Sequence, residues 1–227
     1  MAVVVAVELE EELVKACEEG DVEGCGASVA ALQSRYGVTA EAVQELLGYA
    51  FSCAAAHNQI AVMELLLGRN DNGAVSKDVH EVLLYGMCRR ETFFPRRPRF
   101  RCCYALRYLA YAAVACVEHN ALQALEFLVR QQTPPTAPLL VDTDVVRCFR
   151  YALELGSDFH APAPEAYRPM LMLLLLRFPM LLLPHVDGKQ LDVDVSVDDA
   201  TKKHVQALRS SLLYEYVTNP QMQTQMN

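Results

Sequence analysis

Arginine and phenylalanine side chains gather in one stretch of the sequence, between residues 89 and 107. A guanidinium group binds carboxylates and phosphates through two parallel hydrogen bonds, and a phenylalanine ring supplies apolar contact area at an interface. The candidate partner-binding residues are Arg89, Arg90, Phe93, Phe94, Arg96, Arg97, Arg99, Phe100 and Arg101. Because Pro95 and Pro98 interrupt this stretch, we expect residues 89–101, here called the Arg/Phe segment, to form a projecting loop.

The sequence leaves three interpretations of the Arg/Phe segment open. Its arginines could be solvated and pair with the acidic N-terminal helix of the same chain. They could dock onto an acidic surface of another protein, or they could contact RNA phosphates while the phenylalanines stack on bases. The formal net charge of −8 argues against nonspecific binding of nucleic acid by the chain as a whole, and it favours a protein partner over RNA.

The other reactive residue types indicate no catalytic or metal site. The six histidines show no His-x-x-x-His spacing, and the sequence has neither a Gly-rich phosphate loop nor a Gly-x-Ser-x-Gly motif. His57 and His119 occupy matching places in a repeat, which favours a structural role. The aspartates at 192, 194, 198 and 199 lack the geometry of a calcium loop. We therefore expect no catalytic residue, cofactor, metal or small-molecule substrate.

Eight cysteines are present, and their positions predict reduced, buried thiols. Cys17, Cys53, Cys116 and Cys148 fall at apolar positions of expected helices, and no Cys-x-x-Cys pair occurs. Thiols that serve as small core residues are typical of a reducing compartment. We therefore expect an intracellular protein, with the cytoplasm as the favoured compartment.

One stretch of the sequence occurs twice, at an offset of 62 residues. Residues 47–66 contain Leu-Gly-Tyr-Ala, a cysteine and His-Asn, and residues 109–128 contain Leu-Ala-Tyr-Ala, a cysteine and His-Asn. Each copy predicts a helix with a buried stripe of small residues, a turn at His-Asn, and a second apolar helix. A repeated helical hairpin predicts a stacked array, an architecture that usually binds other proteins.

The clearest copy also resembles a known family. Residues 54–66, Ala-Ala-Ala-His-Asn-Gln-Ile-Ala-Val-Met-Glu-Leu-Leu, are similar to the ankyrin repeat, whose core reads Ala-Ala-x-x-Gly-His-x-x-ψ-Val-x-x-Leu-Leu. The chain departs from that family because it has no Thr-Pro-Leu-His tetrapeptide and its period is about twice as long. The resemblance implies a degenerate ankyrin-like solenoid, and a general array of helical hairpins is the alternative.

Two outer hairpins are expected beside these copies. The first covers residues 12–32, with its turn at Gly20-Asp21. The last begins at Val145, and its second helix is the apolar run from Met170 to Leu176, after a turn over residues 158–169. The predicted fold is therefore all-α, an ankyrin-like solenoid of about four helical hairpins.

The C-terminal region predicts an extended segment and a helix. Residues 191–198 alternate apolar and polar side chains, as a half-buried strand does. This strand either covers the last hairpin, the favoured interpretation, or adds to a sheet edge of another subunit. A helix follows from Ala200 to Val217, and its expected buried face consists of Val205, Leu208, Leu212 and Leu213.

These patterns predict three regions. They are an ankyrin-like repeat domain over residues 1–184 with the insertion 89–101, an extended acidic segment over 185–199, and a C-terminal helix with a polar tail over 200–227. No targeting or membrane-spanning segment is expected, because the N-terminus has no basic start and Arg177 and Pro179 interrupt the longest apolar run.

The expected function is that of a noncatalytic protein-protein interaction scaffold or a structural subunit of a large intracellular assembly. Its partners would be other protein subunits with an acidic surface, bound through the repeat face and the Arg/Phe segment. The alternative is an RNA-contacting subunit of a ribonucleoprotein complex, such as a ribosome-like assembly, that uses the same segment.

Overall fold

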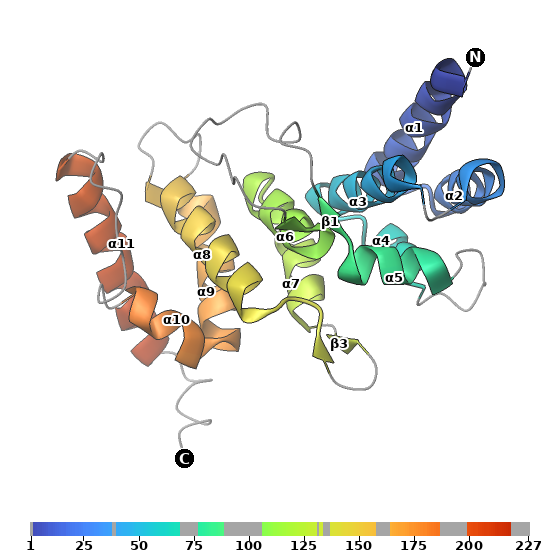
Figure 1. The fold of residues 1–227 in the computed structure, drawn as a ribbon. Helices are drawn as coiled ribbons and strands as arrows, with labels where there is room; N and C mark the ends of the chain where they lie inside the picture. Colours follow the sequence, from blue (N-terminus) through green and yellow to red (C-terminus); the bar gives the residue numbers. More distant parts are fainter. Residues whose placement is uncertain are drawn as a thin grey trace. The chain divides into compact units, whose positions relative to one another are not determined.

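The fold is all-α, as predicted. A computed structural model describes residues 2–37, 40–68, 77–88, 106–130, 132–133, 137–157, 164–186 and 199–218. These residues form helices, short connections and two pairs of two-residue strands (Figure 1). The chain divides into two compact units, residues 1–128 and 129–227, and this division falls inside the predicted 1–184 domain. The predicted domain boundaries near 185 and 199 stay a prediction, because residues 187–198 between them lie outside the described part.

The first unit contains three helical hairpins. The helices are α1 (Ala2–Glu19) and α2 (Val22–Tyr36), α3 (Glu41–Ala56) and α4 (Ile60–Leu66), and α6 (Tyr108–Glu118) and α7 (Leu122–Arg130). A separate helix, α5 (Lys77–Tyr85), lies between the second and third hairpins in the sequence and contacts α3 and α6. The two clear repeat copies therefore form the second and third hairpins, and the expected hairpin at the N-terminus is the first.

All three hairpins turn in the same way. One residue in each turn has a positive φ, namely Gly20, Asn58 and Asn120. The next residue donates its backbone N–H to the carbonyl five positions earlier: Asp21 to Ala16, Gln59 to Ala54 and Ala121 to Cys116, over 2.9, 2.9 and 2.7 Å. This bond is the Schellman ending of an α-helix, and only Gly or Asn fits its left-handed residue at low cost. The turns are thus structurally equivalent, although they are spaced unequally along the chain (Gly20 to Asn58, and Asn58 to Asn120).

The turn of the second hairpin caps helices of both neighbouring hairpins. The Asn58 side-chain oxygen accepts a hydrogen bond of 2.9 Å from the Ala124 backbone N–H, near the start of α7. The Gln59 side chain donates one of 2.9 Å to the Glu18 carbonyl, near the end of α1. The ends of a helix leave backbone groups without partners, and these two side chains satisfy one such group on each side. They therefore fix the register of the three hairpins.

The contribution of the Asn58 cap to stability can be measured by replacing two asparagines at equivalent positions. Asn58→Gly and Asn120→Gly both relieve a left-handed residue, but only Asn58 caps a neighbouring helix, and the Asn120 side chain has no hydrogen bond within the described residues. We expect Asn58→Gly to be less stable than Asn120→Gly by about 1 kcal/mol in urea-induced unfolding. Equal stabilities would show that the bond to Ala124 does not hold the hairpins together.

The predicted stripe of small residues lies in the core. Leu47, Ala50, Ala54, Leu109, Ala112 and Cys116 are all fully buried. Their size lets α3 and α6 lie side by side (Figure 1), and the Cys116 thiol donates to the Ala55 carbonyl across this contact over 3.7 Å. The predictions for the inward face of both repeat copies are therefore confirmed.

The second unit is also helical. It contains the strand pair β3 (Gln132–Thr133) and β4 (Ala137–Pro138), helix α8 (Asp142–Ser157), the 3₁₀ helix η3 (Pro164–Tyr167), and helices α9 (Arg168–Arg177), α10 (Pro179–Val186) and α11 (Asp199–Thr218). Helices α8 and α9 contact each other and correspond to the expected last hairpin. The predicted turn extends too far, because Pro169 lies in the first turn of α9. Proline is tolerated there because the backbone N–H that it lacks would have no partner within the helix.

The C-terminal part differs from expectation in two places. Residues 185 and 186 belong to α10 and Asp199 begins α11, so both described ends of the predicted extended segment 185–199 are helical, while residues 187–198 lie outside the described part. The buried face of α11 was predicted only in part. Leu212 is buried as expected, Leu208 and Leu213 are half-buried, and the side chain of Val205 lies outside the described part. Among the described side chains of α11, Arg209 and Tyr216 are buried together with Leu212. Apolar periodicity could not identify Arg209 as buried, because its side chain is charged.

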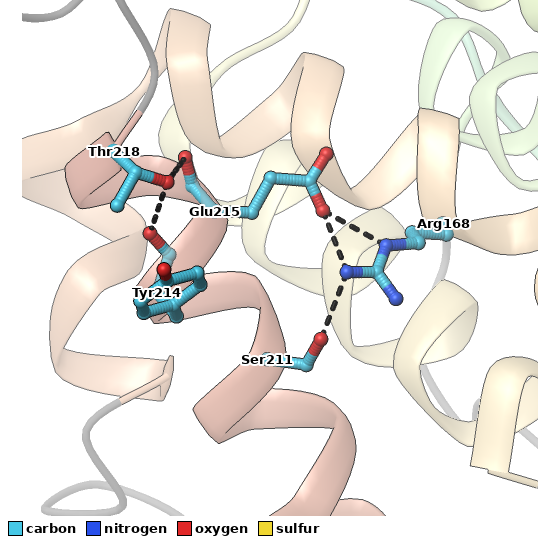
Figure 2. Close-up of polar contacts among 5 residues, drawn as sticks. All are labelled: Arg168, Ser211, Tyr214, Glu215 and Thr218. Atoms are coloured by element: carbon cyan, nitrogen blue, oxygen red, sulfur yellow. Dashed lines mark hydrogen bonds and ion pairs between the residues drawn. The ribbon is translucent and has the colours of Figure 1, made fainter.

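Helix α11 is held against α9 by an arginine (Figure 2). Arg168 donates from Nε and Nη2 to one oxygen of Glu215, over 2.8 and 2.7 Å, and from Nη2 to the Ser211 hydroxyl over 2.8 Å. One edge of the guanidinium is therefore filled by side chains of α11. This contact fixes the rotation of α11 about its own axis.

Candidate functional site

The nine candidate partner-binding residues, Arg89, Arg90, Phe93, Phe94, Arg96, Arg97, Arg99, Phe100 and Arg101, lie outside the described residues. The structure does describe both flanks of the Arg/Phe segment. Strand β1 (Met87–Cys88) pairs antiparallel with β2 (Leu106–Arg107), with Met87 opposite Arg107 and Cys88 opposite Leu106. The two flanks of the segment therefore lie side by side, at a place that we call the segment base.

Hydrogen bonds fix the segment base to α5. The Arg107 side chain donates from Nη2 to the Leu84 carbonyl over 2.9 Å, and the Tyr108 backbone N–H donates to the Gly86 carbonyl over 3.2 Å. Gly86 in turn donates to the Val82 carbonyl over 2.7 Å and so extends the end of α5. The segment base is thus continuous with two helices of the first unit.

Tyr108, the first residue of α6, lies between two glycines. Its ring approaches Gly48 in α3 so closely that a Cβ at Gly48 would overlap it, and a Cβ at Gly86 would also meet the ring. Tyr108 is only 3% exposed. Glycine at both places therefore makes room for an aromatic anchor beneath the segment base.

The segment base carries a signal that was available in the sequence. Where the two repeat copies differ, the first has Gly48 and the second has Ala110. A glycine inside a helix costs about 0.5–1 kcal/mol relative to alanine, so its presence there calls for a structural reason. That reason is Tyr108, whose partner on α3 could not be known before α3 and α6 were seen in contact.

The two matching histidines form an exposed pair. The His57 and His119 rings have centroids 5.9 Å apart and are tilted by 38°. His57 Nδ1 is 2.9 Å from the Cys53 carbonyl, a contact that helps to close its own turn. This contact agrees with the predicted structural role of the histidines.

The cysteines whose side chains the structure describes are buried and form no disulfide, as predicted for Cys17, Cys53, Cys116 and Cys148. The Cys17 and Cys25 sulfurs are 3.7 Å apart, and their hydrogen bond together with burial raises the pKa of Cys17 far above that of an exposed thiol. Burial raises the pKa of Cys53 to about 11 and, with the nearby Asp144, that of Cys148 to about 12. These three thiols are protonated at neutral pH and are therefore poor nucleophiles.

The described residues show few other features that could do chemistry. They contain no group of three or more histidine, cysteine, aspartate or glutamate side chains that could hold a metal ion. Of the aspartates at 192, 194, 198 and 199, only Asp199 is described, at the start of α11. Among the described helices, none is long and apolar enough to cross a membrane. A scan against protein-family models found no match to this chain, and searches of curated proteins and of solved structures found none either.

Proposed function

We propose that this chain is a noncatalytic interaction scaffold, or a structural subunit of an intracellular assembly, built as a degenerate ankyrin-like solenoid. The observation that carries the proposal is the stack of three hairpins with equivalent turns, joined in register by Asn58 and Gln59. Repeat stacks of this kind present extended, rigid surfaces to partners. The buried protonated thiols support the intracellular, reducing environment, with the cytoplasm favoured.

The Arg/Phe segment is the proposed contact with an acidic surface of another protein subunit. Its support lies at the segment base, where β1 pairs with β2, Arg107 binds the end of α5, and Tyr108 is buried between two glycines. A segment that starts and ends on a fixed base loses less conformational entropy on binding than a free chain. Guanidinium groups would pair with carboxylates, and phenylalanines would fill apolar pockets of the partner.

Removing three arginines from the segment tests this function. We expect Arg96→Ala, Arg97→Ala and Arg99→Ala together to abolish partner association and to leave helicity and melting temperature unchanged. The matched control removes the same charge elsewhere, through Arg35→Ala, Arg177→Ala and Lys203→Ala at exposed positions. Affinity purification of the tagged variants with mass spectrometry gives the readout. Equal recovery of partners by both triple variants would overturn the role of the segment.

Two treatments separate a protein partner from RNA. Partners that stay bound after ribonuclease treatment support the protein scaffold, and partners released by it support an RNA-contacting subunit. Affinity for RNA phosphates falls steeply as the salt concentration rises, whereas the affinity of a protein interface anchored by phenylalanines falls less. A steep salt dependence together with ribonuclease sensitivity would replace the proposed function by the RNA alternative.

A further inference from the structure

Two basic side chains occupy interior positions of the second unit. Arg209 lies on the buried stripe of α11 with Leu212 and Tyr216, and only 5% of it is exposed. His185 lies on the buried stripe of α10 with Leu182 and Val186, and 7% of it is exposed. Helices α10 and α11 contact each other, and both contact α8. A charged residue and an ionisable one thus stand where apolar residues normally pack.

Each of these two side chains has at least one buried nitrogen atom without a hydrogen-bond partner among the described residues. These atoms are Nε and Nη2 of Arg209 and Nδ1 of His185. Burying a charged group without a partner is strongly unfavourable, and native proteins do so rarely. An arginine and a histidine with unpaired buried nitrogens in neighbouring helices therefore suit an anionic partner.

The unpaired edge of Arg209 has the geometry that binds an oxyanion. Nε and Nη2 form the side of the guanidinium that donates two parallel hydrogen bonds to carboxylates and phosphates. In the same unit, Arg168 uses these two atoms to bind Glu215 (Figure 2). The same edge of Arg209, six residues before Glu215 on α11, has no hydrogen-bond partner among the described residues.

The surroundings of His185 are cationic. Burial lowers the pKa of His185, and the charges of Arg150 on α8 and Arg209 on α11 lower it further. Burial also lowers the pKa of Arg209. Two guanidinium charges that act on one imidazole suit a ligand with two negative charges. Arg150 itself is exposed.

We propose that Arg209 and His185 form a binding site for a tetrahedral dianion of the phosphate type in the second unit. The Nε and Nη2 edge of Arg209 holds two oxygens of the dianion, and protonated His185 donates to a third from Nδ1. This site is independent of the Arg/Phe segment and of the proposed scaffold function.

The direct test is isothermal titration of the full chain with inorganic phosphate at constant ionic strength. We expect saturable binding that Arg209→Gln weakens about 10–100-fold, as the loss of charge-assisted hydrogen bonds predicts. The control Arg177→Gln removes one exposed guanidinium from α9 and should bind phosphate as the unchanged chain does. Absence of saturable binding, or equal binding by Arg209→Gln, would overturn the proposal.

Stability without ligand gives a second, independent readout. Because Arg209 is an unpaired buried charge, Arg209→Met should raise the melting temperature in anion-free buffer, and phosphate should cancel that advantage by stabilising only the unchanged chain. If Arg209→Met instead lowers the melting temperature whether or not phosphate is present, the guanidinium has a partner within the chain and the proposal fails.

The pH dependence tests His185. Its pKa is lowered in the folded state, so the unfolded chain binds more protons below the ordinary histidine pKa, and stability without ligand falls as the pH drops through that range. Bound sulfate, which stays a dianion, favours the protonated imidazole, so sulfate affinity should rise as the pH falls from about 8 to about 6. His185→Gln should remove this rise. A rise that persists in His185→Gln would exclude the histidine from the site.

Discussion

Replacing Leu66 or Leu128 with alanine is expected to lower the free energy of unfolding by about 2–5 kcal/mol. Leu66 ends α4 and Leu128 lies in α7, at matching positions of the two repeat copies, and both are fully buried. Each change removes apolar contacts and leaves a cavity that a closely packed stack cannot fill. Because the positions are equivalent, the two costs should be similar.

Chemical denaturation followed by far-ultraviolet circular dichroism measures these costs. Met180→Ala is the matched control, because it shortens an apolar side chain that is 88% exposed and should change stability by less than about 0.5 kcal/mol. The two compact units can unfold separately, so the transition of the first unit has to be identified before the fits are compared. A negligible shift at both leucines would rule out the proposed stack.

Tyr108→Ala is expected to cost about 3–5 kcal/mol and to weaken partner binding at the same time. The ring fills the space left by two glycines on different helices, so its loss opens a cavity directly beneath the segment base. Tyr85→Ala is the control: it makes the same chemical change one residue before Gly86, but Tyr85 is 74% exposed. The control should lose neither stability nor binding.

A double-mutant cycle tests the contact itself. Gly48→Ala alone should cost about 1–3 kcal/mol, because the added methyl group overlaps the Tyr108 ring. In a chain that already carries Tyr108→Ala, the methyl group finds space and Gly48→Ala should cost little or become favourable. Additive effects of the two changes would show that Tyr108 does not occupy the space above Gly48.

The sequence predicted the parts of the fold that follow from local patterns. The repeat at offset 62 identified the second and third hairpins, and Gly20-Asp21 identified the first, since glycine and asparagine are the residues that adopt the left-handed turn. The inward face of α3 and α6 followed from the spacing of small residues. These features depend only on residues a few positions apart.

Features that depend on distant residues could not be predicted. The pairing of Tyr108 with Gly48 and Gly86 joins three elements, and the sequence carries only the unexplained glycine in α3. The burial of Arg209 in α11 was missed because arginine looks like a surface residue when only hydrophobicity is considered. Helix α10 was missed because Pro179 reads as an interruption, although proline is well suited to starting a new helix.

The unequal spacing of the equivalent turns has a consequence for how this protein folds. The first two hairpins follow each other directly, so their contacts close short stretches of chain and can form early. The third hairpin can contact α3 only after α5, the strand pair and the Arg/Phe segment have been synthesised, because these lie between the second and third hairpins in the sequence. A nascent chain would therefore complete α1 to α4 first and add α6 and α7 in a slower step, during which the Arg/Phe segment is synthesised and exposed before its base has formed.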